Sequence, residues 1–372
     1  MENEKFKVTP WEVSGKIDYK KLVEYFGVDE MSDSLIKRFP QQHFMLRRKI
    51  FYAHRDLDFI LNEYENGTKF YLYTGRGPSG KTHMGHLLPW IFNKYLQDTF
   101  KVELYFQITD DEKFLFNEDL TLEDTKKLAY DNALDVIALG FDPEKTTIFL
   151  DTENASVLYP LAIKIAKKIT FSTTKAVFGF TNSTNIGSIF YTSMQSVPAF
   201  LLSELESRKV PCLIPCAIDQ DPHFRVTRDV AESLGYYKPS SMYCKLLPGL
   251  LGNEKMSSSQ PGSSIFTTDD EETVRKKIVN TFTGGAVSIK EQRLHGGNPD
   301  ICSVYSYLHF FFEQDDKKLN EMYGRCRSGD LLCGECKEIL IGKVNRFLKK
   351  HQKGREKAKD NITKFVKKIE VK

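Results

Sequence analysis

Two motifs, far apart in the chain, carry residue types suited to phosphate chemistry. The first is Gly75-Arg76-Gly77-Pro78-Ser79-Gly80-Lys81-Thr82, which runs directly into His83-Met84-Gly85-His86. A strand-like run, Phe70–Thr74, precedes it, and a helix-like run, Leu87–Phe92, follows it. A strand, a glycine-rich turn and a helix N-terminus together present backbone N–H groups and a positive dipole end to an anion. The stretch therefore predicts a phosphate-binding loop.

The loop itself allows two interpretations. Gly75 to Thr82 matches the P-loop pattern G-x-x-x-x-G-K-[ST], and Asp151, after Ile148-Phe149-Leu150, could serve as its Mg²⁺-binding carboxylate. In the second interpretation the chemistry lies on His83 and His86. Their i, i+3 spacing places both imidazoles on one face of the first helical turn, where they can donate hydrogen bonds to a triphosphate. The rest of the chain has to decide.

The second motif is Lys255-Met256-Ser257-Ser258-Ser259, in a stretch rich in Gly, Ser and Pro. A loop lysine can close over the β- and γ-phosphates and neutralise departing pyrophosphate. Together the two motifs resemble the signatures of class I aminoacyl-tRNA synthetases. A P-loop kinase or NTPase would not explain the second motif. The resemblance implies catalytic roles for His83, His86, Lys255, Met256 and Ser257. It implies ATP contacts for Arg76, Gly77, Pro78, Ser79, Gly85, Lys255 and Ser258.

Three longer stretches narrow the resemblance. Tyr71–Ser79, Gln107–Lys113 and Ile214–Arg225 are similar to the tryptophanyl-tRNA synthetase family of eukaryotic and archaeal type, in the family's order. The similarity covers nearly the whole chain. For the tryptophan pocket it implies that Tyr73 and Gln107 contact the indole N–H of the substrate. It further implies that the substrate's α-amino group is surrounded by Glu112, Gln195 and Gln220, and that the pocket wall includes Cys216 and Phe224. One departure is a loop before His83 that is one residue short and carries Lys81.

The implied activity is tryptophan–tRNA ligation with Mg-ATP, and the implied partners are tryptophan, ATP, tRNA(Trp) and a second copy of the chain in a homodimer. The resemblance assigns tRNA binding to the C-terminal helices. Residues 337–372 hold 13 Lys and Arg against 4 Asp and Glu, a basic surplus suited to RNA phosphates. Tyrosyl-tRNA synthetase, which shares both signatures, stays open as the nearer alternative, and a P-loop enzyme that uses Gly75 to Thr82 as the remote one.

The composition is ordinary for a soluble globular protein. The 372 residues are 41% hydrophobic, and no apolar run reaches the ~20 residues of a membrane span. The N-terminal residues show no targeting pattern, so we expect a cytoplasmic protein without membrane contact. The seven cysteines are odd in number and scattered. Cys333 and Cys336, near Cys326, have metal-like spacing but lack a second ligand pair, so we interpret the cysteines as reduced packing residues and expect no metal.

The order of elements predicts an α/β fold with a Rossmann-like parallel sheet. We expect strands within 70–74, 102–108, 148–150 and 211–218, and helices at 19–26, 122–139 and 225–234. We also expect helical spacing from 46 to 64 and a strand-like piece at 176–180. The predicted domains are an N-terminal extension (1–69), a catalytic domain (70–265) with a mostly helical dimerisation insertion (about 152–208), and an all-α anticodon-binding domain (266–372).

Overall fold

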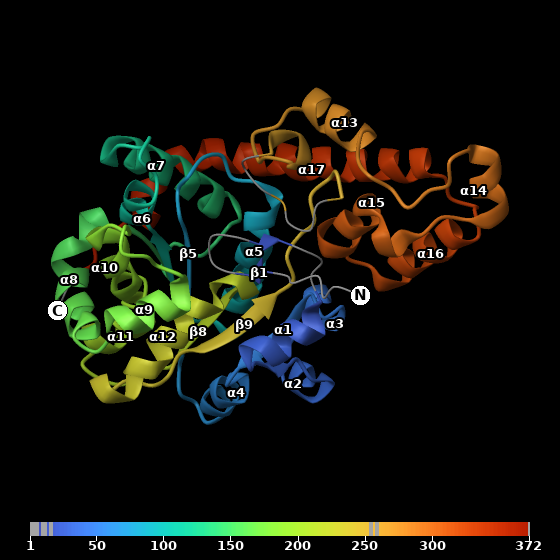
Figure 1. Cartoon of the computed structure of the whole chain (residues 1–372). Coiled ribbons are helices and arrows are strands. Elements are labelled where there is room, and N and C mark those ends of the chain that lie inside the picture. Colours follow the sequence, from blue (N-terminus) through green and yellow to red (C-terminus); the bar gives the residue numbers. More distant parts are fainter. Residues whose placement is uncertain (1–6, 9–12, 15–17, 253–255, 257–259, 371–372) are drawn as a thin grey trace.

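The computed structural model describes residues 7–8, 13–14, 18–252, 256 and 260–370. Lys255, Ser257 and Ser258 lie outside them. A seven-stranded sheet in the order β3-β4-β9-β8-β5-β6-β7 forms the centre (Figure 1). Strands β5 to β9 are parallel, and β4 and β3 add an antiparallel edge. The bounds are β3 (Asp29–Glu30), β4 (Phe51–Arg55), β5 (Tyr71–Arg76), β6 (Leu104–Ile108), β7 (Thr146–Leu150), β8 (Cys212–Ala217) and β9 (Ser240–Cys244); a separate pair is β1 (Lys7–Val8) and β2 (Val13–Ser14).

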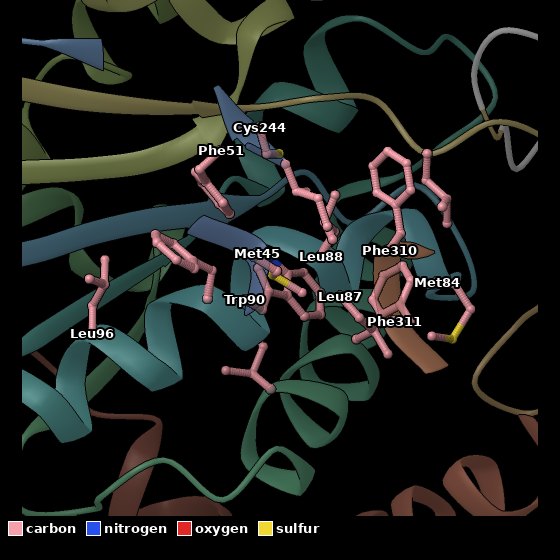
Figure 2. Close-up of a cluster of buried hydrophobic side chains, with 14 of the residues drawn as sticks. Met45, Phe51, Met84, Leu87, Leu88, Trp90, Leu96, Cys244, Phe310 and Phe311 are labelled. Carbon is pink, nitrogen blue, oxygen red and sulfur yellow. The ribbon is translucent and has the colours of Figure 1, made fainter. Parts of the chain in front are cut away.

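Helices cover both faces of the sheet because side chains alternate along each strand. On β6, Leu104, Phe106 and Ile108 join one buried cluster and Tyr105 joins the other. The first cluster includes α4 (Leu57–Glu65), α5 (Met84–Phe100) and α7 (Leu122–Ala138). Figure 2 shows part of it, with Leu88 and Trp90 of α5 among the labelled side chains. The second includes α1 (Tyr19–Phe26), α8 (Ala155–Ala166), α10 (Ile186–Met194), α11 (Pro198–Leu205) and α12 (Asp221–Ala231).

The strand order reverses between β5 and β8. From β5 the chain moves outward through β6 and β7, and after the helical insertion it returns to pair β8 with the other side of β5. The connections that follow the carboxyl ends of β5 and β8 therefore lead away in opposite directions along the sheet. Such a switch point is where open α/β sheets bind their ligands.

Two local expectations are corrected by the structure, and one strand was not expected. The segment 46–64 is not one helix: α3 (Phe44–Arg47) ends before β4, which pairs with β9, and helical structure resumes at Leu57. The piece at 176–180 is not a strand, because α9 (Phe171–Phe178) is capped by Thr170 and ended by Gly179 in a left-handed conformation. Strand β9 was not predicted at all. Each is a short apolar segment, which sequence periodicity cannot assign alone.

The C-terminal part is helical, as expected, but it returns to the sheet. Its long helix α17 (Cys333–Lys359) packs along α7, where the buried Asp135 carboxylate contacts His351 at 2.8 Å and Arg355 at 2.5 Å. Val366 then forms a parallel bridge with Ile148 beside β7. No described helix is long and apolar enough to cross a membrane. The remaining helices are α2 (Asp33–Lys37), α6 (Asp110–Leu115), α13 (Glu271–Val279), α14 (Ile289–His295), α15 (Ser303–Tyr307), α16 (Asp316–Arg327) and α18 (Ile362–Phe365).

Candidate functional site

A cavity of about 640 Å³ opens at the switch point between β5 and β8. The ends of both strands line it, together with the first turn of α5 and residues of α6. Most of the residues singled out in the sequence meet here: Tyr73, Arg76, Gly77, Ser79, His83, Gly85, His86, Glu112, Gln195, Cys216, Gln220, Phe224 and Met256. Pro78 and Gln107 do not line the cavity, although Gln107 contacts residues that do.

Close backbone approach explains a glycine in the first motif. A Cβ on Gly77 would lie 2.2 Å from Lys113 Cε and 2.6 Å from Glu112 Oε2. A side chain at position 77 would therefore displace the ends of the Lys113 and Glu112 side chains. The glycine lets the loop pass directly over the Glu112–Lys113 pair, whose charged atoms are 2.7 Å apart.

The start of α5 concentrates hydrogen-bond donors. Arg76 Nη1 lies 2.7 Å from His86 Nε2, and the His83 backbone N–H donates to His86 Nδ1 at 3.2 Å. Burial lowers the pKa of Arg76 to about 10, so its guanidinium remains charged at neutral pH. A neutral imidazole has only one acceptor nitrogen, so His86 can accept only one of these two donors at a time. An anion between Arg76 and His86 would relieve that competition.

A second observation at Arg76 also points to an anion. Its Nη2 is buried and makes no hydrogen bond to any described residue. The other side of the guanidinium is held, because Nε donates to Asn132 Oδ1 at 3.1 Å. Asn132 Nδ2 in turn donates to the Gly80 carbonyl at 3.1 Å. Asn132 on α7 therefore fixes Arg76 and the far end of the loop together.

A directed chain of hydrogen bonds runs beneath the cavity. Tyr191 donates to Gln195 Oε1, and Gln195 Nε2 donates to Tyr73 Oη at 2.6 Å. Tyr73 Oη donates to Gln107 Oε1 at 2.6 Å. Gln107 Nε2 then donates to both oxygens of Asp151, at 2.9 and 2.8 Å. The successive side-chain donors of this chain lead toward Asp151, and the Tyr73 oxygen, which lines the cavity, keeps a lone pair that can accept from a ligand N–H.

Glu112 on α6 provides a carboxylate at the cavity that could bind a cationic group. Burial would raise the pKa of Glu112, but the Lys113 ammonium and a hydrogen bond from Thr109 outweigh it and lower that pKa. Thr109 Oγ1 donates to Glu112 Oε2 at 2.7 Å. Glu112 is thus held ionised at the cavity wall, where it suits a substrate ammonium.

The second motif reaches the cavity through Met256. This residue is buried, and its N–H donates to the Leu247 carbonyl at 2.9 Å. A Cβ on Gly85 would lie 3.7 Å from the Met256 Cβ, so the two motifs meet at this point. Lys255, Ser257 and Ser258 flank Met256 in the sequence but are outside the described residues.

Four further residues at or behind the cavity wall were not predicted as site residues of a synthetase; one of them, Asp151, had been considered only as the Mg²⁺-binding carboxylate of a P-loop. Lys113 and Lys245 line the cavity, and burial lowers the pKa of Lys245. Asn132 and Asp151 act behind the cavity wall, through Arg76 and Gln107. Lys113 was visible in the sequence as the residue that follows Glu112 in the stretch Gln107–Lys113. The other three become apparent only when the fold brings distant segments together.

Comparisons with known proteins agree with this geometry. Residues 65–349 match the family described as tRNA synthetases class I (W and Y). The chain belongs to this class of synthetases. The tryptophan–tRNA ligase of Pyrobaculum calidifontis is 54% identical over 364 residues, 97% of each chain, and that of Thermococcus onnurineus is 52% identical over 97% of this chain and 94% of its own. Within the class, the chain is therefore a member of the tryptophan–tRNA ligase family.

Solved structures show the same relationship. The tryptophanyl-tRNA synthetase of Plasmodium falciparum superposes with a TM-score of 0.89 at 42% identity, over 94% of this chain and 98% of its own. The enzyme from Aeropyrum pernix gives a TM-score of 0.87 at 34% identity, over 95% and 97%. These similarities confirm the class I fold and do not favour the P-loop alternative.

Proposed function

We propose that the chain activates tryptophan with ATP and transfers it to tRNA(Trp). The tryptophan carboxylate attacks the α-phosphate, pyrophosphate leaves, and tryptophanyl-adenylate remains bound. A ribose hydroxyl of the terminal adenosine then attacks the adenylate carbonyl, giving charged tRNA and AMP. No protein nucleophile is needed, because positioning and electrostatic stabilisation suffice for both steps.

The hydrogen-bond chain that ends at Asp151 is the observation that carries this assignment. It fixes the orientation of the Tyr73 hydroxyl and the Gln107 amide, and in this proposal their oxygens accept from the indole N–H. A site built around such acceptors rejects side chains that lack the donor, because the acceptors are then left unpaired. Phe224 stands edge-to-face with Tyr73, its ring centroid 6.0 Å away, and supplies an aromatic wall. Tyrosine is the less favoured substrate, because the relatives are named for tryptophan.

In this proposal the phosphates occupy the start of α5. Arg76, His83 and His86 donate to the triphosphate, and Gly77 and Ser79 contribute loop backbone. Lys255 closes from the second motif over the β- and γ-phosphates, beside Met256. Glu112, Gln195 and Gln220 hold the substrate ammonium, with Glu112 supplying the charge.

Mg²⁺ accompanies ATP in this proposal. Among the described residues, no three His, Cys, Asp or Glu side chains are grouped to hold a metal ion. Mg²⁺ commonly keeps several waters and binds through substrate phosphates with few protein ligands. The residues around the cavity fit an ion that is carried by the triphosphate.

The C-terminal helices would bind the tRNA. Helix α17 exposes Arg346, Lys349, Lys350, Lys353 and Lys357, while its apolar side packs on α7 and its neighbours. Such a basic face suits the phosphate backbone, whose binding is largely electrostatic. The location would be the cytoplasm, which fits seven free cysteines.

We further propose a homodimer through the inserted helices. Tyr159 and Ile163, one helical turn apart on α8, are 55% and 45% exposed, and Ile186 at the start of α10 is 84% exposed. Large exposed apolar side chains of this kind mark interaction surfaces. Sedimentation should give a dimer, and Tyr159→Lys with Ile163→Glu should give a monomer.

The assignment is tested by aminoacylation of unfractionated tRNA. Labelled tryptophan should be incorporated and labelled tyrosine should not. Incorporation of tyrosine in place of tryptophan would contradict the proposed pocket but keep the class.

A further inference from the structure

Arg55, the last residue of β4, joins the C-terminal end of α1 to the start of α12. Its Nη1 and Nη2 donate to the carbonyls of Gly27 and Phe26, at 2.9 and 2.6 Å. Its Nε and Nη2 also donate to the two carboxylate oxygens of Asp221, at 2.8 and 3.0 Å. Arg55 does not line the cavity, so direct contact with a substrate does not account for this arrangement.

The charges alternate along this contact. Carbonyl groups at the C-terminal end of α1 form the negative end of its dipole and attract a cation, which Arg55 supplies. Backbone N–H groups at the start of α12 form the positive end of another dipole and attract an anion, which Asp221 supplies as the first residue of that helix. The ion pair therefore lies between two helix ends of opposite sign, and each charge is held by a helix as well as by its partner.

Both charged groups are largely withdrawn from water. The Asp221 side chain is fully buried, and that of Arg55 is 14% exposed. Tyr243 of β9 also donates to Asp221 Oδ1, so both carboxylate oxygens accept hydrogen bonds. A buried ion pair contributes little net stability, but removal of either charge is costly because the other is then buried and unpaired. The pair therefore specifies one placement of α12 relative to β4 and β9.

The start of α12 carries two residues of the proposed tryptophan site. Gln220 directly precedes Asp221, Phe224 lies about one turn after it, and both line the cavity. In the buried cluster on this side of the sheet, Phe224 packs together with Phe26 of α1. The positions of Gln220 and Phe224 therefore depend on how Asp221 is held.

We propose that Arg55 and Asp221 are positioning residues for the tryptophan site. Their ion pair fixes the first turn of α12, and with it the side chains of Gln220 and Phe224. This inference rests on the proposed function, which assigns the substrate ammonium to Gln220 and an aromatic wall to Phe224. A small rotation of α12 would move both away from tryptophan and would leave the phosphate side, at the start of α5, in place.

Arg55→Lys tests the pair while keeping the positive charge. One ammonium cannot reproduce the guanidinium fork that reaches both Asp221 oxygens and both α1 carbonyls. We expect the KM for tryptophan in ATP–pyrophosphate exchange to rise roughly tenfold, with kcat and the KM for ATP nearly unchanged. Asp221→Asn, which removes the negative charge but keeps the shape of the side chain, should give the same pattern.

Arg228→Lys is the matched control on the same helix. The Arg228 side chain is 16% exposed and donates to Asp56 Oδ2 and to the Pro239 carbonyl, at 2.6 Å each. Neither partner lines the cavity, so this variant should leave both KM values at the parent level. A rise in both KM values on Arg55→Lys, or an equal rise in the tryptophan KM on Arg228→Lys, would show general loosening of α12 and would overturn the positioning role.

A neutralised pair separates positioning from folding. Arg55→Met alone leaves the Asp221 charge buried and should lower the melting temperature. Arg55→Met combined with Asp221→Asn removes both charges. It should restore most of the melting temperature, while the KM for tryptophan stays roughly tenfold above that of the parent. Recovery of the KM together with the melting temperature, or an unchanged tryptophan KM in an active Arg55→Lys variant, would overturn the proposal and leave the proposed function standing.

Discussion

Gln107 Nε2 donates both of its hydrogen bonds to one carboxyl group, that of Asp151. This contact determines which end of the amide faces Tyr73. With Nε2 held by Asp151, Oε1 must accept from the Tyr73 hydroxyl, and its second lone pair stays available. In the proposed function Asp151 is therefore a positioning residue, which acts on the substrate pocket through Gln107.

Asp151→Asn tests this positioning. An asparagine can accept or donate, so the Gln107 amide would no longer have a single preferred orientation. We expect the KM for tryptophan in ATP–pyrophosphate exchange to rise roughly tenfold to a hundredfold, as for loss of a buried hydrogen bond of ~1–3 kcal/mol. The KM for ATP should stay nearly unchanged. A benzothienyl analogue of tryptophan, which lacks the N–H, should be rejected by the parent chain. The Asp151→Asn variant should discriminate less between tryptophan and this analogue. The same discrimination in parent and variant would contradict the role of Asp151.

The neighbouring carboxyl groups make stability depend on pH. Burial, with the charge of Asp110, raises the pKa of Asp111 to about 6, and burial and Asp111 raise that of Asp151. In the unfolded chain an Asp ionises near pH ~3.9. The stabilising contribution is therefore complete below about pH 4 and is lost as the pH rises through about 6.

Asp111→Asn should remove that loss. At about pH 7.5 the variant's free energy of unfolding should exceed the parent's by on the order of 1 kcal/mol, so its melting temperature should be higher. At about pH 4.5 the gain should be small. Asp119→Asn, on an exposed turn, is the matched control and should change neither value. A gain of equal size at both pH values would show that ionisation is not its cause.

Lys255 and Lys81 separate the two interpretations of the glycine-rich loop. Lys255→Ala should lower kcat for tryptophan activation by orders of magnitude and change the Kd of tryptophan little, because the lysine acts on the phosphates. Lys81 does not line the cavity, and Lys81→Ala should have a small effect. Essential Lys81 with dispensable Lys255 would restore the P-loop interpretation.

Asn132 offers a test of the proposed ATP-binding residues that leaves the proposed tryptophan pocket unchanged. Asn132→Ala removes the contacts to both Arg76 and the Gly80 carbonyl. We expect the KM for ATP to rise about tenfold, which corresponds to roughly 1.4 kcal/mol, with tryptophan binding measured by calorimetry unchanged. Equal losses for both substrates would indicate general loosening of the sheet edge.

The sequence located the site better than some of the surrounding elements. His83, His86 and Met256 were found because they belong to two motifs that resemble the synthetase signatures, and the structure brings all three to the cavity. Strands β4 and β9 were missed because their pairing with each other, and not their own periodicity, makes them strands. Asn132 was missed as a site residue, and Asp151 was considered only as the Mg²⁺ ligand of a P-loop, for a related reason. Their partners, Gln107 and Arg76, are tens of positions away, and only the folded sheet brings them into contact.

The most direct test of the central claim is ATP–pyrophosphate exchange by the purified chain, with each proteinogenic amino acid supplied separately. The account predicts exchange with tryptophan alone, lost on Lys255→Ala and weakened through KM on Asp151→Asn. Exchange with tyrosine instead would contradict the pocket built from Tyr73, Gln107 and Asp151. Absence of exchange with every amino acid, together with ATP hydrolysis that Lys81→Ala abolishes, would contradict the assignment of the reaction itself.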